Sequence, residues 1–106
     1  MSQSRIEQAR ALFAQFPNNE LARFNLAQAL CEAGEHREAI EHLTVLTRQK
    51  PDWMVAHILL GKSHLALGET ERARPVLERA LELAIAQHHD GPREELVALL
   101  QTIPKQ

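Results

Sequence analysis

The sequence has little of what several common kinds of protein require. Cys31 is its only cysteine, so an intrachain disulfide is excluded, in agreement with a reducing compartment. It has no alternating run of β-branched and aromatic residues, and no Asn-Gly or Asp-Gly turn between two such runs. The absence of strand signals favours an all-α protein without covalent cross-links.

A large excess of charge of one sign is also missing. Lys and Arg total 12 against 14 acidic residues, and no block of five like charges occurs. Nucleic-acid binding needs a concentrated basic face, so we expect no nucleic-acid partner. No apolar run is long enough to cross a bilayer or to act as a secretory signal at the N-terminus, which predicts no membrane association and a cytoplasmic location.

What the sequence does contain is the composition of an ordinary folded domain. Hydrophobic residues make up 44% and charged residues 25% of 106 residues, which leaves room for one modest core and no second domain. We therefore treat residues 1–106 as a single domain.

The strongest signal is an internal repeat of about 34 residues, the interval from Gly34 to Gly68, which we call the repeat period. The same interval carries the first predicted helix onto the third, as in Ile6 with Ile40 and Leu12 with Leu46. The repeat period predicts a half repeat at residues 4–17, full repeats at 18–51 and 52–85, and a C-terminal capping helix at 90–103. The identities spaced by one repeat period pair Pro17 with Pro51, Ala22 with Ala56, Leu26 with Leu60, Gly34 with Gly68, Glu35 with Glu69, Ala39 with Ala73, and Leu43 with Leu77.

Local signals place the helix ends inside this period. Ser4 and Glu7 have the spacing of a capping box, which predicts a helix beginning at Ser4. Gly34 and Gly68 stand where the two helices of a pair reverse direction, because glycine accepts the left-handed backbone of such an exit. Each full repeat is therefore predicted to be an antiparallel helix hairpin.

Two prolines make further predictions. Pro92 follows Asp90-Gly91 and suits the first turn of the last helix, where a missing amide costs nothing. Pro75 lies several residues beyond Gly68, where it removes a backbone hydrogen bond. We expect a kink at Pro75 or a late start of that helix.

These residues resemble the tetratricopeptide-repeat family, whose pattern of the same length combines an aromatic residue, a Leu-Gly pair, a small residue in the second helix and a closing proline. The resemblance implies about six helices stacked as hairpins into a right-handed superhelix. The sequence departs from the pattern where Arg23 and His57 replace the aromatic residue and Ile85 replaces the second closing proline. The matching motifs are Leu26-Ala27-x-x-Leu30, Ala39-x-x-x-Leu43 and Pro51 in the first repeat, and Leu60-Gly61-x-x-His64 and Ala73-x-x-x-Leu77 in the second.

In that family the first helix of each pair lines a concave groove that binds a peptide or another protein. The resemblance therefore implies a module that binds a protein or peptide segment with apolar anchors, and Phe24, Ile58 and Leu65 are the expected anchors. Since Asn25 and Lys62 are the only residues left of a basic clamp for acidic tails, we expect no such clamp. The groove positions carried over are Leu21, Phe24, Asn25, Gln28 and Cys31 from the first repeat, and Val55, Ile58, Leu59, Lys62 and Leu65 from the second.

Other functions receive less support from the residues. No Gly-rich phosphate loop or Gly-x-Ser-x-Gly turn is present, so we predict no enzyme, no catalytic residue and no cofactor. Cys31 and His36 are close in sequence, but such a pair is common, and we interpret Cys31 as a small buried or half-buried thiol rather than a nucleophile. His57 and His64 are two helical turns apart rather than one, so no metal site is predicted.

Alternatives to partner binding remain open. The apolar groove face could instead be buried against a second copy, which would make the chain a homo-oligomerising assembly element, or against the predicted helix from Leu96 to Ile103. The anchors could also simply pack between neighbouring helices, since an apolar stripe at helical spacing is usually part of a core.

Overall fold

The computed structural model describes residues 2–104. These residues form six α-helices and no strand, as the sequence predicts. The helices are α1 (Ser2–Gln15), α2 (Glu20–Glu32), α3 (His36–Gln49), α4 (Met54–Ala66), α5 (Thr70–Ala86) and α6 (Asp90–Gln101).

The repeat period is visible in where the helices begin. α4 begins one repeat period after α2, and α1, α3 and α5 begin one repeat period apart at Ser2, His36 and Thr70. The last step is longer, because α6 begins 36 residues after α4. Burial supports this longer step, since Leu96 aligns with Leu60 and both are buried.

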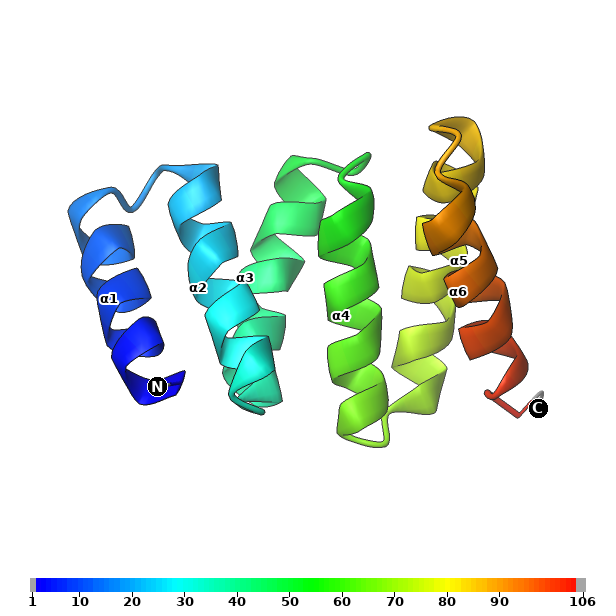
Figure 1. The fold of residues 1–106 in the computed structure, drawn as a ribbon, viewed down its shortest axis with the longest axis horizontal. Helices are drawn as coiled ribbons and strands as arrows, with labels where there is room; N and C mark the ends of the chain where they lie inside the picture. The colour runs from blue at the N-terminus through cyan, green and yellow to red at the C-terminus, as the bar shows by residue number, and fades with distance from the viewer. Residues whose placement is uncertain (1, 105–106) are drawn as a thin grey trace.

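The helices form an elongated stack of 41 × 27 × 22 Å. α2, α4 and α6 lie in one layer, with α3 and α5 behind them, and α1 stands at one end of the stack beside α2 (Figure 1). The two chain termini lie at opposite ends of the long axis (Figure 1). Each helix packs on the next in sequence, and α2 also contacts α4.

Three helices end in the same hydrogen-bonded turn. After α2, the amide of Glu35 donates to the carbonyl of Leu30, and Gly34 has φ +81°. Gly68 has φ +76° in the matching turn after α4, which confirms both predicted glycine exits. His88 occupies that position after α5 with φ +60°, although it has a side chain.

Helix starts are less uniform. Asn19 caps α2, because its Oδ1 accepts a hydrogen bond of 2.9 Å from the amide of Ala22. The predicted cap at Ser4 is wrong: α1 begins at Ser2, so Ser4 lies inside its first turn and cannot be the residue before the helix. α6 begins at Asp90 with Pro92 in its first turn, as expected.

The start and end of α5 correct two expectations. α5 begins at Thr70 and continues through Pro75, so the predicted late start is wrong. Pro75 is exposed, which leaves water free to reach the carbonyl that lacks its usual donor, while a kink there stays a prediction. α5 continues to Ala86 because Ile85, unlike Pro51 in the first repeat, can extend a helix.

Two hydrophobic clusters fill the stack. The first joins α1 to α4 around the fully buried leucines Leu26, Leu30, Leu43 and Leu46, and the second joins α4 to α6 around Leu77 and Leu96. Gly61 allows the close crossing of α4 and α5, since a Cβ atom built on it would lie 2.4 Å from Cδ2 of Leu77. A residue with a side chain at position 61 would therefore collide with Leu77.

Candidate functional site: the face of α2 and α4

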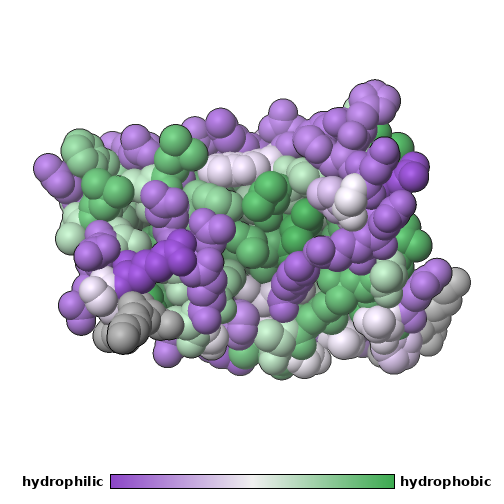
Figure 2. All heavy atoms as spheres, in the orientation of Figure 1, coloured by the Kyte–Doolittle hydropathy of each residue, from purple (hydrophilic) through white to green (hydrophobic). Residues whose placement is uncertain are grey.

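The predicted groove residues lie on the layer formed by α2 and α4. The turn of each helix that carries Leu26 or Leu60 is buried, which leaves other positions of the same helices outside the core. Leu21 is 67% exposed and Val55 is 42% exposed at equivalent places near the helix starts. Figure 2 shows hydrophobic side chains gathered over the middle of this face, with hydrophilic ones around them.

Phe24 is not free to act as an isolated anchor. Its ring stacks on the ring of Trp53 with centroids 4.8 Å apart, and Trp53 is the residue that precedes α4. Lys50 lies over the Trp53 ring, with Nζ 5.6 Å from its centroid. Trp53 thus joins the two repeats through a direct contact with Phe24 that the sequence did not reveal.

Three other apolar groove residues, Ile58, Leu59 and Leu65, are half-buried. Ile58 and Leu65 pack against the second hydrophobic cluster, and Leu59 packs against the first. Part of each side chain therefore already belongs to the core. Leu21 and Val55 present the largest free apolar surface among the ten predicted positions.

Three polar positions differ in how much of them is available. Asn25 is exposed and Gln28 is half-buried. Lys62 is exposed but pairs with Glu95 of α6, with Nζ and Oε1 2.7 Å apart. The sequence did not predict Glu95 at this face, because Glu95 lies on α6, outside the two repeats that supplied the predicted groove positions.

Cys31 lies in a small polar cluster at the edge of the face. Its Sγ is 3.3 Å from Oγ of Ser63, which is also 3.3 Å from Nδ1 of His36. Burial raises the pKa of the Cys31 thiol, although the Ser63 hydroxyl acts in the opposite direction. A thiol whose pKa is raised is a poor nucleophile, so this cluster resembles a packed polar junction between α2, α3 and α4.

The two buried histidines each have a protein partner. Nδ1 of His57 donates to the carbonyl of Trp53 at 2.8 Å, and Nδ1 of His64 lies 2.8 Å from a carboxylate oxygen of Glu69. Within residues 2–104, no three His, Cys, Asp or Glu side chains come together in a way that would hold a metal ion.

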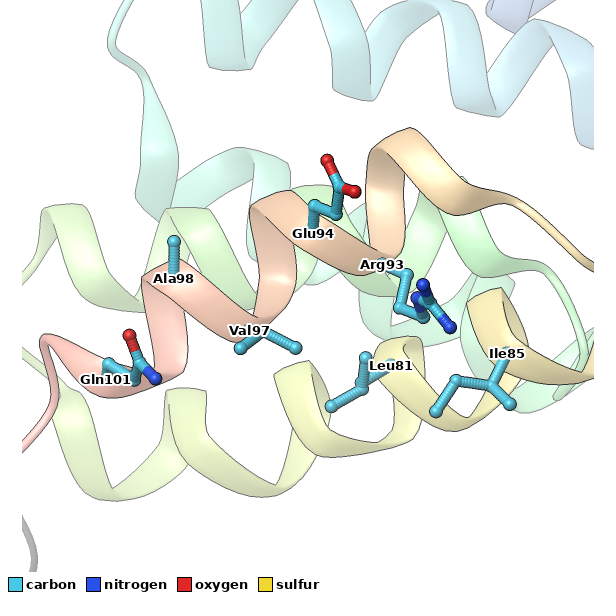
Figure 3. Close-up of a pocket in the computed structure, with 7 residues that line it drawn as sticks. All are labelled: Leu81, Ile85, Arg93, Glu94, Val97, Ala98 and Gln101. Atoms are coloured by element: carbon cyan, nitrogen blue, oxygen red, sulfur yellow. The ribbon is translucent and has the colours of Figure 1, made fainter.

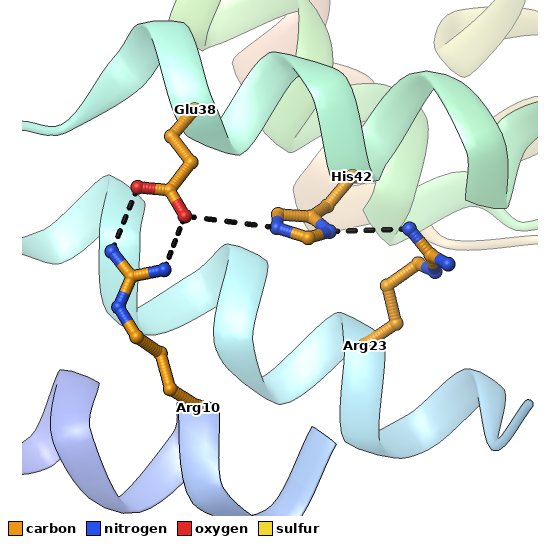
Figure 4. Close-up of polar contacts among 4 residues, drawn as sticks. All are labelled: Arg10, Arg23, Glu38 and His42. Carbon is orange, nitrogen blue, oxygen red and sulfur yellow. Dashed lines mark hydrogen bonds and ion pairs between the residues drawn. The ribbon is translucent and has the colours of Figure 1, made fainter. Parts of the chain in front are cut away.

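Behind this face, polar side chains tie α1, α2 and α3 together (Figure 4). Arg10 donates from Nη2 to Oε1 of Glu38 at 2.8 Å, and its other nitrogen pairs with the second oxygen. This bidentate contact lowers the pKa of Glu38. His42 accepts at Nδ1 from Arg23, and burial, together with the positive charge of Arg23, lowers the pKa of His42.

Aromatic contacts complete this network. The ring of Phe13 meets the ring of His42 edge-on with centroids 5.4 Å apart, and the guanidinium of Arg23 lies 4.7 Å from the Phe13 centroid. The arrangement holds α1 against its neighbours, so it serves the fold rather than a reaction.

Every helix in residues 2–104 is too short or too polar to span a membrane.

Comparison with known proteins now identifies the family. The family model described as "Anaphase-promoting complex, cyclosome, subunit 3" matches residues 3–80, which is most of the chain. A TPR repeat-containing protein of Pseudomonas aeruginosa is 29% identical over 100 residues, covering 94% of this chain and 95% of that protein. The chain belongs to this tetratricopeptide-repeat family. Such repeats are protein-interaction modules and are typically not enzymes.

Two further matches agree with the tetratricopeptide-repeat family. The solution structure of a protein from Bordetella parapertussis superposes with a TM-score of 0.78 at 28% identity, covering 92% of this chain and 85% of the other. Anaphase-promoting complex subunit 3 of Dictyostelium discoideum is 36% identical over 67 residues. That match covers 63% of this chain and 7% of the subunit, so it concerns the repeats alone.

Proposed function

We propose that this protein binds a segment of another polypeptide across the face of α2 and α4. The observation that supports this best is the paired exposure of Leu21 and Val55, which occupy equivalent positions of the two repeats. Because α2 contacts α4, the two helices that carry these side chains lie side by side. Exposed apolar surface of this kind is typical of interaction sites.

The chemistry of the face favours an apolar partner. Its lysine, Lys62, is paired with Glu95, so little positive charge is left to hold a carboxylate-rich tail. Asn25 and Gln28 can hydrogen-bond a backbone beside the apolar side chains. A short helix or an extended segment with two apolar side chains fits these groups.

The test uses peptides selected from a random library against the full chain, with affinity measured by fluorescence anisotropy. Val55→Glu is preferred to a change at Ile58, because Val55 is more exposed and is not part of a buried cluster. Val55→Glu and Leu21→Glu should each weaken binding about tenfold or more, since each places a charge in an apolar contact. Glu41→Ala on α3 is the control, because Glu41 is exposed on a helix of the other layer. Equal affinity for all three variants would contradict the proposal.

The second candidate function is self-association through the same face. It predicts a concentration-dependent dimer whose mass falls to that of one chain in Val55→Glu, as measured by light scattering. A chain that stays monomeric while still binding selected peptides would exclude this alternative.

A further inference from the structure

The end of the stack formed by α5 and α6 contains an open hollow of about 470 Å³ (Figure 3). Leu81 and Ile85 of α5 line one side, and Val97 of α6 lines the other. Ile85 is 54% exposed and Val97 is 41% exposed, so the hollow has an apolar floor. In residues 2–104 no helix covers it.

The opposite end of the stack has a second hollow of about 260 Å³, between α1 and α2. Arg5, Gln8, Ala9 and Leu12 of α1 line it together with Asn25 of α2. Leu12 is 41% exposed here. One repeat period aligns Leu12 with Leu46 of α3, which is fully buried in the first cluster.

In the aligned helices inside the stack, the residues that match Val97 and Leu12 are covered by a neighbouring helix. By the longer step from α4 to α6, Val97 of α6 aligns with Gly61 of α4, which is buried where α5 packs on α4. The exposed side of α6 therefore corresponds to the side of α4 on which α5 packs. α1 aligns with α3 and is therefore equivalent to the second helix of a pair. It exposes Leu12, whereas the matching residue of α3, Leu46, is buried in the core.

We propose that a second copy of this chain covers each hollow. α1 of one copy lies in the hollow between α5 and α6 of its neighbour, while α6 of that neighbour lies in the hollow between α1 and α2. The two helices together form a composite pair equivalent to α4 and α5. The contact uses the ends of the stack and shares Asn25 with the binding face of α2 and α4.

The sizes of the side chains at the crossing agree with this pairing. In the pair α4–α5, Gly61 stands against Leu77. The same alignments place Val97 of α6 against Ala9 of the incoming α1, since Ala9 corresponds to Leu43 and Leu77. In α4–α5 the first helix carries the smaller residue, whereas in the proposed pair the first helix, α6, carries the larger one. This keeps the crossing filled without overpacking it.

Charge does not oppose this contact. The α5–α6 hollow is lined by Arg93 and Glu94, which have opposite signs. The arginines of α1, Arg5 and Arg10, pair with Glu32 and Glu38 of the same copy. The two ends differ in structure and lie at opposite ends of the long axis, so the contact is head-to-tail and leads to a ring or an open filament (Figure 1).

A mixing experiment tests the proposal. Val97→Glu destroys the α6 end and leaves the α1 end intact, and Leu12→Glu does the reverse. We expect the wild-type mass to rise with concentration beyond that of a dimer in light scattering, while each variant alone stays at the 12.0 kDa of one chain. An equimolar mixture should reach twice that mass and no more, because each variant offers one intact end.

Controls separate this assembly from other outcomes. Ala14→Glu changes an exposed residue on the far side of α1 from Leu12, and it should assemble like the wild type. Circular dichroism checks that each variant is folded, and Ala98→Glu replaces Val97→Glu if helicity falls, since Ala98 lines the same hollow. The proposal is overturned if the wild type is monomeric at all concentrations or if the mixture stays monomeric. It is also overturned if association is abolished by Val55→Glu but survives both end variants.

Discussion

The helix pairs α2–α3 and α4–α5 begin one repeat period apart and bury leucines at matching positions, yet they pack and end differently. Ala27 of the first pair is replaced in the second by Gly61, which contacts Leu77. α3 stops before Pro51, whereas α5 continues past the matching Ile85. The period thus sets where helices begin, while single side chains set how closely they cross and how far they run.

The largest expected effect comes from the leucines at the two crossings. Leu43→Ala and Leu77→Ala should each lower the free energy of unfolding by about 2–5 kcal/mol, because both side chains are fully buried. The loss at Leu77 should be the greater, since Gly61 has no side chain to fill part of the void. Urea unfolding of both variants measures the difference. Equal losses would mean that the closer crossing of α4 and α5 has no energetic consequence.

Adding a methyl group at the closer crossing gives the next effect. Gly61→Ala should destabilise the protein by about 1–3 kcal/mol, because the new Cβ meets a buried Leu77 that has no free space to move into. Gly91→Ala in α6 is the matched control, since nothing lies within 4 Å of the added atom. The control should be neutral or stabilising by up to about 1 kcal/mol. Thermal unfolding that shows no difference between the two would contradict the close crossing.

A smaller effect of opposite sign is expected where α5 ends. α2 and α4 exit through Gly34 and Gly68, but α5 exits through His88 with φ +60°. His88→Gly should raise the free energy of unfolding by about 1 kcal/mol, because a left-handed backbone strains every residue with a side chain. Gly34→Ala should lower it by a similar amount. A neutral or destabilising His88→Gly would show that the imidazole makes a compensating contact in this turn.

The smallest effect concerns pH and belongs to the first pair alone. Burial and Arg23 lower the pKa of His42 in the folded protein, so the unfolded chain binds the proton first as the pH falls below about 6.5. Stability should therefore decline between about pH 6.5 and the lower folded pKa, and be unaffected by His42 above that range. His42→Gln should flatten this part of a stability profile measured by urea unfolding at several pH values. An unchanged slope would mean that His42 is protonated equally well in both states.

Much of the fold could be predicted from the sequence because it depends on local and periodic features. Gly34 and Gly68 allow a backbone that few other residues adopt, and the leucines spaced by one repeat period mark the buried side of each helix. The start of α1 could not be placed, because Ser4 and Glu7 match a capping pattern that also occurs inside a first turn. The end of α5 could not be placed either, because Ile85 stands where the first repeat has Pro51 and does not itself mark the end of a helix.

The candidate site was harder to predict, since its details depend on contacts between distant parts of the chain. The pairing of Lys62 with Glu95 joins α4 to α6, with the whole of α5 between them in the sequence. The stacking of Phe24 on Trp53 joins the middle of one helix to the residue before another. The α2–α4 face itself came from the family resemblance, and its role in binding remains a proposal.

The binding proposal is tested most directly by nuclear magnetic resonance, with a selected peptide titrated into isotope-labelled protein. If a segment lies across α2 and α4, the amides around Leu21, Asn25, Val55 and Lys62 should shift most, and Val55→Glu should abolish those shifts. Shifts confined to the hollow between α5 and α6, or to α1, would contradict the proposed site.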